Sequence, residues 1–315
     1  MRCLCCNKVI NDPGKYEKTV SWHERCIKKF FGTDKMPEID LSEKAMERLA
    51  NNAVNKGLTI PGVQKKLSLH LETVDKNAKL TIVDHPTGYI LKPYSDEYEC
   101  LPESEYLSMQ MAEIAKIKTV PHALINLNDK YAYITRRIDR DADELYAMED
   151  FCQLSGRQTD DKYRSSYETC GKVIKKYSKN TGLDMTELFY RLLFCFVTGN
   201  SDMHLKNFSL IEDSPHSRIY NLSPAYDMLP VNIIVSSDDE QMALSLNGKK
   251  KNIRKKDFLA LAENFEISEK TALRLMEKVL SYKEAFLKET EESYISDEMK
   301  TALKDLIAER MRVLI

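Results

Sequence analysis

The sequence GNSDMHLKNFS occupies residues 199–209 and directly follows an apolar stretch, residues 185–197, that has helical spacing. This order predicts a helix, a tight polar loop and a short strand, a frame that can hold side chains in fixed positions. Asp202 and Asn207 stand five residues apart in the loop, with Lys206 between them. An Asp that accepts a hydroxyl proton, followed by an Asn that holds a metal ion, is typical of catalytic loops for phosphoryl transfer.

A second isolated carboxylate follows in the sequence PAYDMLP, residues 224–230, after a strand-like stretch at 217–221. Here Asp227 would hold magnesium against nucleotide phosphates, because hard cations prefer carboxylate oxygens. Isolated aspartates are also common in turns, so Asp202 and Asp227 can each be interpreted as residues that cap short loops. As an ordered set with Asn207, they favour an enzyme.

The chain upstream of this helix is rich in predicted strands. β-branched and aromatic residues between Gly, Pro, Asn and Asp predict strands at 63–71, 80–83, 89–91, 122–126 and 131–136. Helical spacing predicts helices at 41–55, 103–117, 185–197 and 269–287. We therefore expect an α+β fold with a β-rich first lobe and a mainly helical second lobe, between which a nucleotide can bind. The expected parts are a small Cys/His segment at 1–40, the β-rich lobe at 41–138 and the helical lobe at 139–315.

The first lobe contributes cations that suit a nucleotide. The sequence YILKP places Lys92 at the end of an apolar strand, where a charge is unfavourable unless it meets an anion such as a phosphate. A lysine at a strand end is otherwise simply solvated. Glu103 and Glu105 open the next predicted helix, and either can pair with Lys92. The loop GLTIPGVQKK, residues 57–66, can lay backbone N–H groups and Lys66 along phosphates, although two glycines around a proline also make an ordinary turn.

Length and charge exclude several classes of protein. The 315 residues are 43% hydrophobic and 30% charged, which describes an ordered chain long enough for two lobes. A net charge of −2 gives no general attraction to nucleic acid or to an anionic membrane. No apolar run approaches the roughly 18 residues of a membrane span, and the first ten residues lack the features of a secretory signal. We therefore expect a cytoplasmic protein. The basic run at 249–256 either meets nucleic-acid phosphates or forms a solvated turn.

The eight cysteines are unevenly distributed along the chain. Two pairs, Cys3 with Cys6 and His23 with Cys26, have the spacing of zinc ligands and would supply three sulfurs and one nitrogen. Cys5 can replace either of its neighbours, which leaves the ligand set open, and such pairs can also arise by chance near a chain terminus. The other four cysteines are expected to be small core side chains: Cys100, Cys152, Cys170 and Cys195.

These motifs together resemble the HipA-type serine/threonine kinases, the toxins of bacterial toxin–antitoxin pairs. The resemblance runs from about residue 57 to beyond residue 226 and includes a further family signature, EDFCQ, at 149–153. It implies a HipA-like, protein-kinase-like fold with ATP and Mg2+ as cofactors. By resemblance, Asp202 is the catalytic base, and Asn207 and Asp227 hold magnesium. The residues implied to bind the nucleotide are Val63, Gln64, Lys65, Lys66, Lys92, Arg136, Arg137, Ile138, His204, Lys206, Asn207, Tyr226 and Asp227.

The resemblance also implies regulation of the phosphate loop. Thr59 stands where the family usually carries an autophosphorylated serine, and Pro61 stands where some members offer a second serine. Threonine can accept phosphate by the same chemistry, whereas proline has no hydroxyl. Phosphate on a loop that embraces ATP would repel the nucleotide, so self-phosphorylation of Thr59 is expected to silence the enzyme.

The resemblance further suggests a substrate and partners. The expected substrate is a protein serine or threonine, with an aminoacyl-tRNA synthetase as the implied target. The chain looks like the short HipT-like form, in which a separate small protein similar to the HipA N-terminal subdomain acts with a DNA-binding antitoxin. DNA would then be met only through the antitoxin. Two alternatives remain: a catalytically silent kinase-like scaffold that represses transcription with an antitoxin, and a small-molecule kinase on the same fold.

Overall fold

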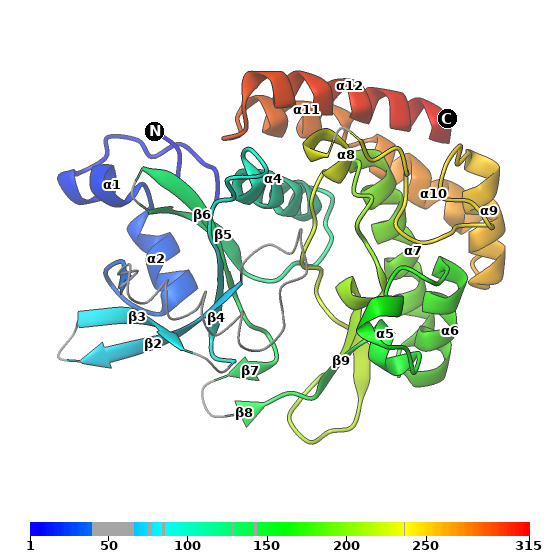
Figure 1. The fold of residues 1–315 in the computed structure, drawn as a ribbon, viewed down its shortest axis with the longest axis horizontal. Coiled ribbons are helices and arrows are strands. Elements are labelled where there is room, and N and C mark those ends of the chain that lie inside the picture. Colours follow the sequence, from blue (N-terminus) through cyan, green and yellow to red (C-terminus); the bar gives the residue numbers. More distant parts are fainter. Residues whose placement is uncertain (40–65, 75–76, 84–85, 128, 142–143, 236) are drawn as a thin grey trace. The chain divides into compact units, whose positions relative to one another are not determined.

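A computed structural model places the residues of this chain in two units (Figure 1). Unit 1 consists of Met1–Glu97, Leu101–Tyr106 and Val120–Ile138, and unit 2 of Tyr98–Cys100, Leu107–Thr119 and Asp139–Ile315. The structure describes residues 1–39, 66–74, 77–83, 86–127, 129–141, 144–235 and 237–315. The helix expected at 41–55 and most of the phosphate loop expected at 57–66 lie outside the described residues.

The centre of unit 1 is a six-stranded sheet with the strand order β1-β3-β2-β4-β6-β5. The edge strand β1 is parallel to β3, and all the other neighbours are antiparallel. The strands predicted from β-branched and aromatic patterning correspond to β2 through β6, so the β-rich first lobe is confirmed. The strands span Glu38–Ile39 (β1), Leu67–Val74 (β2), Asn77–Val83 (β3), Tyr89–Lys92 (β4), His122–Leu127 (β5) and Lys130–Arg136 (β6).

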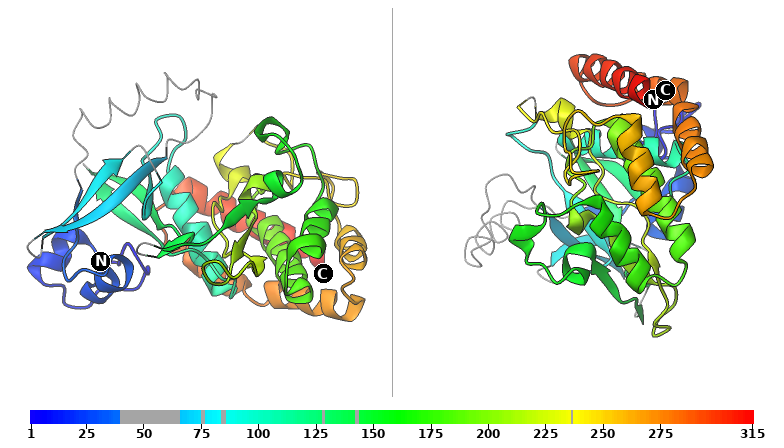
Figure 2. Two further views of the ribbon diagram at one scale, coloured as in Figure 1. Left: turned by 90° about the horizontal axis from the view of Figure 1, so that it is seen from below. Right: turned by 90° about the vertical axis from the view of Figure 1, so that its right-hand side faces the viewer.

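Two short helices at the N-terminus, α1 (Lys15–Val20) and α2 (Glu24–Phe31), lie beside this sheet and appear in blue in Figures 1 and 2. Their contact with the sheet is aromatic: the rings of Phe30 and Phe31 lie 6.0 and 5.6 Å from that of Tyr89 on β4. Trp22 completes the group and is fully buried. The burial of four large rings supplies a core that so short a segment lacks by itself.

Helix α4 (Leu101–Ile114) follows β4 in the chain and carries Pro102 in its first turn, where a missing N–H costs nothing. Most of its side chains are buried, and these include the polar ones of Ser104, Glu105, Ser108 and Gln110. It begins two residues before the predicted helix at 103–117 and ends three residues earlier. Its first residues belong to unit 1 and its remainder to unit 2.

Unit 2 is built around α7 (Thr181–Thr198). All of its side chains from Leu188 to Val197 are buried, and all of these except Arg191 are apolar. A helix that is apolar on all sides needs cover on all sides, and α6, α10 and α12 pack against it. The predicted helix at 269–287 is two helices, α10 and α11, because the chain turns at Ser281 and Tyr282. The helices span Phe151–Leu154 (α5), Tyr167–Tyr177 (α6), Val231–Ile234 (α8), Lys255–Asn264 (α9), Glu269–Leu280 (α10), Lys283–Glu291 (α11) and Asp297–Leu314 (α12).

A small sheet with the order β11-β10-β9 stands at the end of the polar loop in unit 2. The strand predicted after the loop is β10 (Ser209–Glu212), which pairs with β9 (Met148–Asp150) and β11 (Tyr220–Leu222). β7 (Arg140–Asp141) and β8 (Glu144–Leu145) form a separate hairpin. The sheet therefore brings residues 148–150 next to residues 209–211, and with them the segment that follows each strand. None of the helices in the described part of the chain is long and apolar enough to cross a membrane.

Candidate active site

The loop between α7 and β10 is a tightly bonded structure centred on Asp202. Gly199 ends α7 in the left-handed conformation, with φ of 71°, and turns the chain away from the helix axis. The side chain of Asn200 accepts a hydrogen bond from the Asp202 N–H at 3.2 Å, and the Asn207 amide donates to the Asp202 carbonyl at 2.9 Å. Asn207 lies in a short 3-10 helix, η2 (Leu205–Asn207). Asp202, the expected base, and Asn207, an expected magnesium ligand, are thus joined by a direct hydrogen bond.

Tyr163 reaches this loop from a distant part of the sequence. Its hydroxyl donates to Asp202 Oδ1 at 2.5 Å, and it comes from the segment between η1 (Thr159–Asp161) and α6. Burial raises the pKa of the Tyr163 hydroxyl, and the negative charge of Asp202 raises it further. The tyrosine therefore stays protonated and acts as the donor. Sequence analysis missed this residue, and no local pattern marks it.

His204 lies beside the same two residues. Its ring stands edge-on to that of Tyr163, with the ring centroids 4.9 Å apart. The backbone N–H of His204 donates to the Asp202 carbonyl at 2.8 Å. Burial lowers the pKa of the imidazole, against the opposing effect of the Asp202 charge, so the ring is neutral near pH 7. In the described part of the chain its buried Nδ1 has no hydrogen-bond partner.

Lys206, predicted to bind the nucleotide, forms an ion pair with Asp150 across the small sheet. The distance from Nζ to Oδ2 is 2.9 Å. Asp150 also caps α5, because its carboxylate accepts from the Gln153 N–H at 2.9 Å while the Gln153 side chain bonds back to the Asp150 N–H. The EDFCQ signature thus contains a capping box whose acid also orients Lys206. The cap was readable from the spacing of Asp150 and Gln153, whereas the ion pair required the pairing of β9 with β10.

Tyr226 and Asp227 follow β11. The Tyr226 hydroxyl donates to the Lys206 carbonyl at 3.1 Å and lies 2.6 Å from the Ser209 hydroxyl, which ties the two loops together. Asp227 has a φ of 58°, in the left-handed region that non-glycine residues rarely adopt and that is often found at functional sites. Its charge acts on His204, because it helps to raise the pKa of that imidazole.

The oxygen-bearing side chains of unit 2 suit a magnesium ion. Asn207 offers an amide oxygen and Asp227 a carboxylate, and Mg2+ is a hard cation that takes oxygen ligands. The hydrogen bond from the Asn207 amide nitrogen to the Asp202 carbonyl sets the orientation of that amide. The donor set therefore fits the ion that the resemblance implied.

In unit 1, Lys92 forms a buried ion pair with Glu105, one of the two glutamates predicted as its partner. Its Nζ lies 2.5 Å from Glu105 Oε1, and the two side chains are 4% and 1% exposed. The ammonium also stands 5.3 Å from the centre of the Tyr133 ring. A buried charge pair costs solvation that apolar side chains would not lose, so its presence at a strand end suggests a functional reason.

The remaining predicted nucleotide residues lie at strand ends or outside the described residues. Arg136 ends β6, and its N–H donates to the Pro121 carbonyl at 3.0 Å, while the Arg137 N–H donates to Gly88 at 2.8 Å. Ile138 is the last residue of unit 1. Lys66 is exposed directly before β2. Four predicted residues lie outside the described part of the chain: Thr59, Val63, Gln64 and Lys65.

The four predicted zinc ligands come together in unit 1. One ligand atom from each of Cys3, Cys6, His23 and Cys26 lies within 4.8 Å of all the others, and Cys5 is outside this group. The four scattered cysteines were expected in the core. Cys152, Cys170 and Cys195 are buried as predicted, whereas Cys100 is half-exposed and precedes α4.

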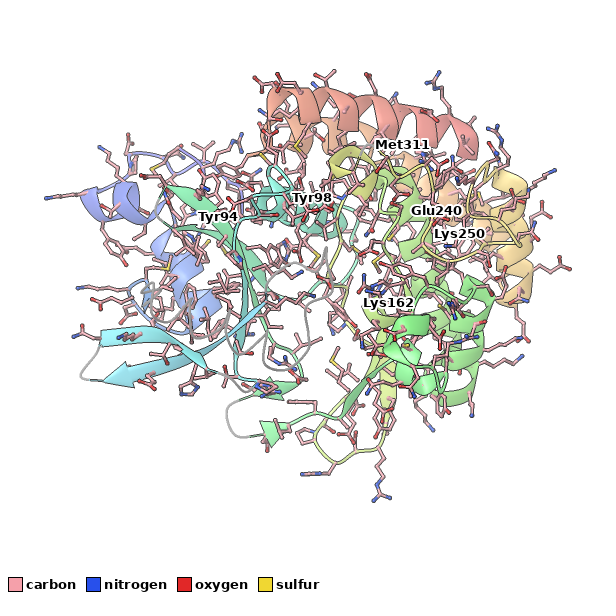
Figure 3. All side chains as sticks on the ribbon, viewed as in Figure 1. Tyr94, Tyr98, Lys162, Glu240, Lys250 and Met311 are labelled. Atoms are coloured by element: carbon pink, nitrogen blue, oxygen red, sulfur yellow. The ribbon has the colours of Figure 1, made fainter. Side chains whose placement is uncertain are left out.

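Three of the six cations in the basic run at 249–256 form ion pairs with nearby acids. Lys249 pairs with Asp257 at 2.8 Å, and Lys250 pairs with Glu240 at 3.0 Å (labelled in Figure 3). Lys251 pairs with an acid as well, Asp239, at 2.5 Å. These contacts favour the solvated turn over a surface for nucleic acid.

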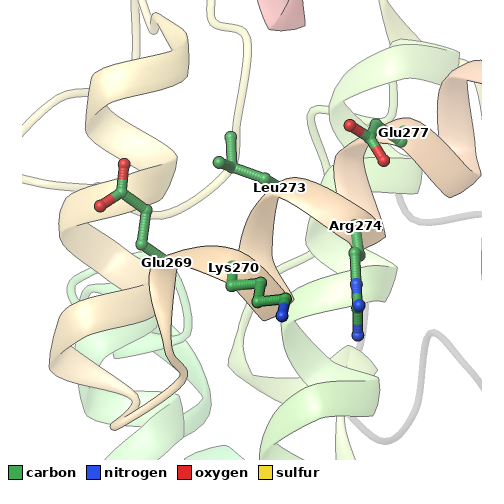
Figure 4. A pocket seen from close by; sticks show the side chains of 5 residues that line it. All are labelled: Glu269, Lys270, Leu273, Arg274 and Glu277. Carbon is green, nitrogen blue, oxygen red and sulfur yellow. The ribbon is translucent and has the colours of Figure 1, made fainter.

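Among the described residues, unit 2 has at least two surface hollows, and neither of these two contains a predicted site residue. Figure 4 shows the first, which is lined by five side chains of α10 alone. The second is lined by residues of α5, α6 and the small sheet. The residues of the first are Glu269, Lys270, Leu273, Arg274 and Glu277. The polar loop around Asp202 is therefore the better candidate for chemistry.

Solved structures define the class of fold. A chain in the complex of the Shewanella oneidensis MR-1 toxin–antitoxin proteins HipA and HipB with operator DNA matches 81% of this chain and 64% of its own length, with a TM-score of 0.68 and 17% identity. The Helicobacter pylori proinflammatory kinase CtkA matches 78% of this chain and 90% of its own length, with a TM-score of 0.55 and 14% identity. This protein therefore has a HipA-like kinase fold.

The sequence then identifies the family. Residues 58–286 match the family model described as HipA-like C-terminal domain, and the chain belongs to that family. The Sinorhizobium fredii protein named "Putative kinase Y4dM" is 32% identical over an alignment 259 residues long, which covers 77% of this chain and 61% of the relative. A Haemophilus influenzae protein named "Putative kinase" is 29% identical over 56% of this chain and 53% of its own length. The chain thus spans about half to three-fifths of these relatives.

Proposed function

We propose that this protein is a kinase that transfers the γ-phosphoryl group of ATP to a serine or threonine hydroxyl of another protein. The observation that carries the proposal is the hydroxyl group already held at Asp202. Tyr163 Oη donates to Asp202 Oδ1 at 2.5 Å, so the carboxylate accepts a hydrogen bond from a hydroxyl group in this structure. Family membership and the HipA-like fold support the same activity.

In the proposed transfer, the oxygen of the acceptor hydroxyl forms a bond to the γ-phosphorus. The bond from that phosphorus to the oxygen that bridges it to the β-phosphate breaks, and ADP leaves with that oxygen. Asp202 takes the proton of the attacking hydroxyl. Asn207 and Asp227 would hold Mg2+, which supplies positive charge to the phosphate oxygens. Such catalysis consists mainly of positioning and electrostatic stabilisation.

The remaining residues would bind and orient ATP. Lys92, whose direction is set by the 2.5 Å contact with Glu105, offers positive charge to the phosphates. Lys206 is oriented by Asp150, and His204 is neutral and buried beside the base. The nucleotide would also meet Tyr226, the segment 136–138 and the loop residues up to Lys66. These roles follow the family motif residue by residue.

The experiment is incubation of the protein with γ-labelled ATP and cell lysate, compared with the Asp202→Asn variant. Loss of a general base lowers the rate by about 100-fold or more, so labelling of protein should nearly disappear. The Asp213→Asn variant, changed on an exposed loop, is the matched control and should label as the parent does. Equal labelling by the parent and Asp202→Asn would contradict the kinase proposal and favour the alternative of a catalytically silent scaffold. Label that appears only in small molecules would indicate a small-molecule kinase.

The finer proposals concern the target and its regulation. We propose an aminoacyl-tRNA synthetase as the phosphorylated protein and Thr59 as the autophosphorylated residue. Mass spectrometry after incubation with ATP tests both, because the labelled lysate protein and the modified Thr59 peptide can each be identified. Thr59 that remains unmodified in the parent after incubation would refute the regulatory part and leave the kinase proposal intact.

A DNA-binding antitoxin is the proposed partner. The Shewanella relative was solved with HipB and operator DNA, and the lysines at 249–251 of this chain are already paired with acids, which favours indirect contact with DNA. Co-expression with the products of neighbouring genes and capture of this chain should retain the antitoxin and the separate small protein similar to the HipA N-terminal subdomain. Operator DNA should be retained only together with the antitoxin. Capture of DNA by the chain alone would contradict the proposal.

A further inference from the structure

The cysteine and histidine side chains near the N-terminus have the separations of a tetrahedral metal site. Cys6 Sγ and Cys26 Sγ lie 3.6 and 3.8 Å from His23 Nδ1. With zinc bonds of about 2.3 Å to sulfur and about 2.0 Å to nitrogen, a regular tetrahedron has ligand–ligand edges of about 3.5 to 3.8 Å. The ligand atoms of Cys3, Cys6, His23 and Cys26 all lie within 4.8 Å of one another. The two sulfur–nitrogen separations therefore match a zinc site, and the remaining ligand atoms lie close enough to bind the same ion.

The groups around these ligands orient them as in a metal centre. His23 Nε2 lies 3.3 Å from the Val9 carbonyl, so this nitrogen carries the proton and Nδ1 keeps its lone pair for a metal. The backbone N–H of His23 donates to Cys3 Sγ at 3.4 Å, and this contact stabilises the thiolate form of Cys3. The turn that returns Cys6 to Cys3 is closed by the Asn7 N–H on the Cys3 carbonyl at 2.9 Å.

The same segment, residues 1–31, covers the edge of the sheet in unit 1; we refer to it as the N-terminal module. β5 is the last strand in the sheet order, and the Leu124 N–H donates to the Leu4 carbonyl at 2.8 Å. Trp22 Nε1 donates to the Leu124 carbonyl at 3.1 Å. On the adjacent face, the Tyr89 hydroxyl donates to the Phe30 carbonyl at 3.3 Å. The module thus pairs backbone groups that an edge strand would otherwise expose.

We propose that the N-terminal module binds one structural zinc ion through Cys3, Cys6, His23 and Cys26, and that this ion holds the module on the β5 edge. Four protein ligands leave no open position on a tetrahedral ion, so the site is structural rather than catalytic. α1 has no buried residue, and α2 buries its apolar side chains partly against the sheet. Metal binding commonly supplies folding free energy to segments this short. The proposal is independent of the kinase activity, because none of these residues belongs to the candidate active site.

The first test measures metal in the purified full-length chain by native mass spectrometry and elemental analysis. The parent should carry one zinc per chain, and Cys6→Ser and Cys26→Ser should lose it. The matched controls are Cys5→Ser, next to the ligands, and Cys100→Ser, in another part of the chain; both should keep one zinc. A zinc-free parent after reconstitution under reducing conditions would overturn the proposal. Loss of zinc in Cys5→Ser with retention in Cys6→Ser would overturn the ligand set.

A second test uses the parent alone, so it does not depend on the folding of the variants. Trp22 is the single tryptophan of the chain, and it is fully buried in the module. Removal of the metal with a chelator and a reductant should shift its fluorescence emission to longer wavelength, and zinc should reverse the shift. Replacement by Co2+ should give the visible absorption of a tetrahedral site with thiolate charge-transfer bands. Unchanged emission on removal of the metal, or absence of the cobalt bands, would refute the structural role.

Discussion

The Tyr163 hydroxyl donates a hydrogen bond of 2.5 Å to Asp202 Oδ1. Under the proposed function, this carboxylate must accept the proton of the substrate hydroxyl, so Tyr163 stands where that hydroxyl would bind. The tyrosine is 41% exposed and comes from a loop, so it can be displaced without disturbing the core. The contact therefore competes with the substrate.

We expect Tyr163→Phe to raise the rate of protein labelling. A hydrogen bond to a charged group is worth about 1.5 to 3 kcal/mol, and partial exposure lowers the effect, so the increase should be up to about 10-fold. The initial rate of label transfer at low substrate concentration measures it. Tyr177→Phe, at another exposed tyrosine of unit 2, is the control and should leave the rate unchanged. A lower rate in Tyr163→Phe would indicate that the hydroxyl positions Asp202 instead.

The buried pair of Lys92 and Glu105 allows stability and activity to be separated. Glu105→Gln removes the negative charge that lies 2.5 Å from the buried ammonium, which should lower the free energy of unfolding by about 3 to 5 kcal/mol. The double variant Lys92→Met/Glu105→Leu removes both charges and should recover most of that stability while it remains without transfer activity. Urea unfolding and label transfer measure the two properties. Glu103→Gln, on the same helix turn, is the control, and transfer activity in the double variant would show that Lys92 is dispensable.

Asp227 combines a metal-binding carboxylate with a left-handed backbone. Asparagine tolerates this conformation, so Asp227→Asn should change stability by less than about 0.5 kcal/mol. Asp227→Ala should cost about 1 kcal/mol more, because alanine disfavours a φ of 58°. Both variants lack the carboxylate and should need at least about 10-fold more Mg2+ for half-maximal transfer, each 1.4 kcal/mol of lost binding being tenfold. An unchanged magnesium requirement in Asp227→Asn would remove Asp227 from the metal site.

The buried tyrosines make stability sensitive to alkaline pH. Burial raises the pKa of Tyr167 and of Tyr190, whose hydroxyls donate to the carbonyls of Met203 and Ala115. The native state thus keeps protons that the unfolded chain releases above its tyrosine pKa of about 10. The stabilisation is complete below about pH 10 and falls as pH rises above it, by at most about 1.4 kcal/mol per pH unit for each tyrosine.

Denaturant unfolding at several pH values from about 8 to 11 measures this decline. The free energy of unfolding of Tyr190→Phe should fall less steeply with pH than that of the parent. The free energy of unfolding of the control Tyr177→Phe, at an exposed tyrosine, should fall as steeply as that of the parent. Identical slopes in the parent and in Tyr190→Phe would show that the buried hydroxyl ionises equally in both states.

Much of the fold was predictable because its signals are local. The apolar repeat of α7, the β-branched runs of β2 to β6 and the ligand spacing of the N-terminal cysteines each lie within a few consecutive residues. The break between α10 and α11 was missed because apolar residues continue through the turn at Ser281 and Tyr282. Spacing shows which residues share a face, and a turn of two residues changes it little.

The sequence by itself determined the two-lobed class of fold, the order of Lys92, Asp202, Asn207 and Asp227, and the family. Only the tertiary structure decided the partners of these residues. It paired Lys92 with Glu105 rather than Glu103, brought Asp150 to Lys206, and placed Tyr163 on Asp202. The reason is physical: hydrogen bonds and ion pairs depend on distances of a few ångströms between side chains, and residues 39 or 56 positions apart come within that reach only when the chain packs.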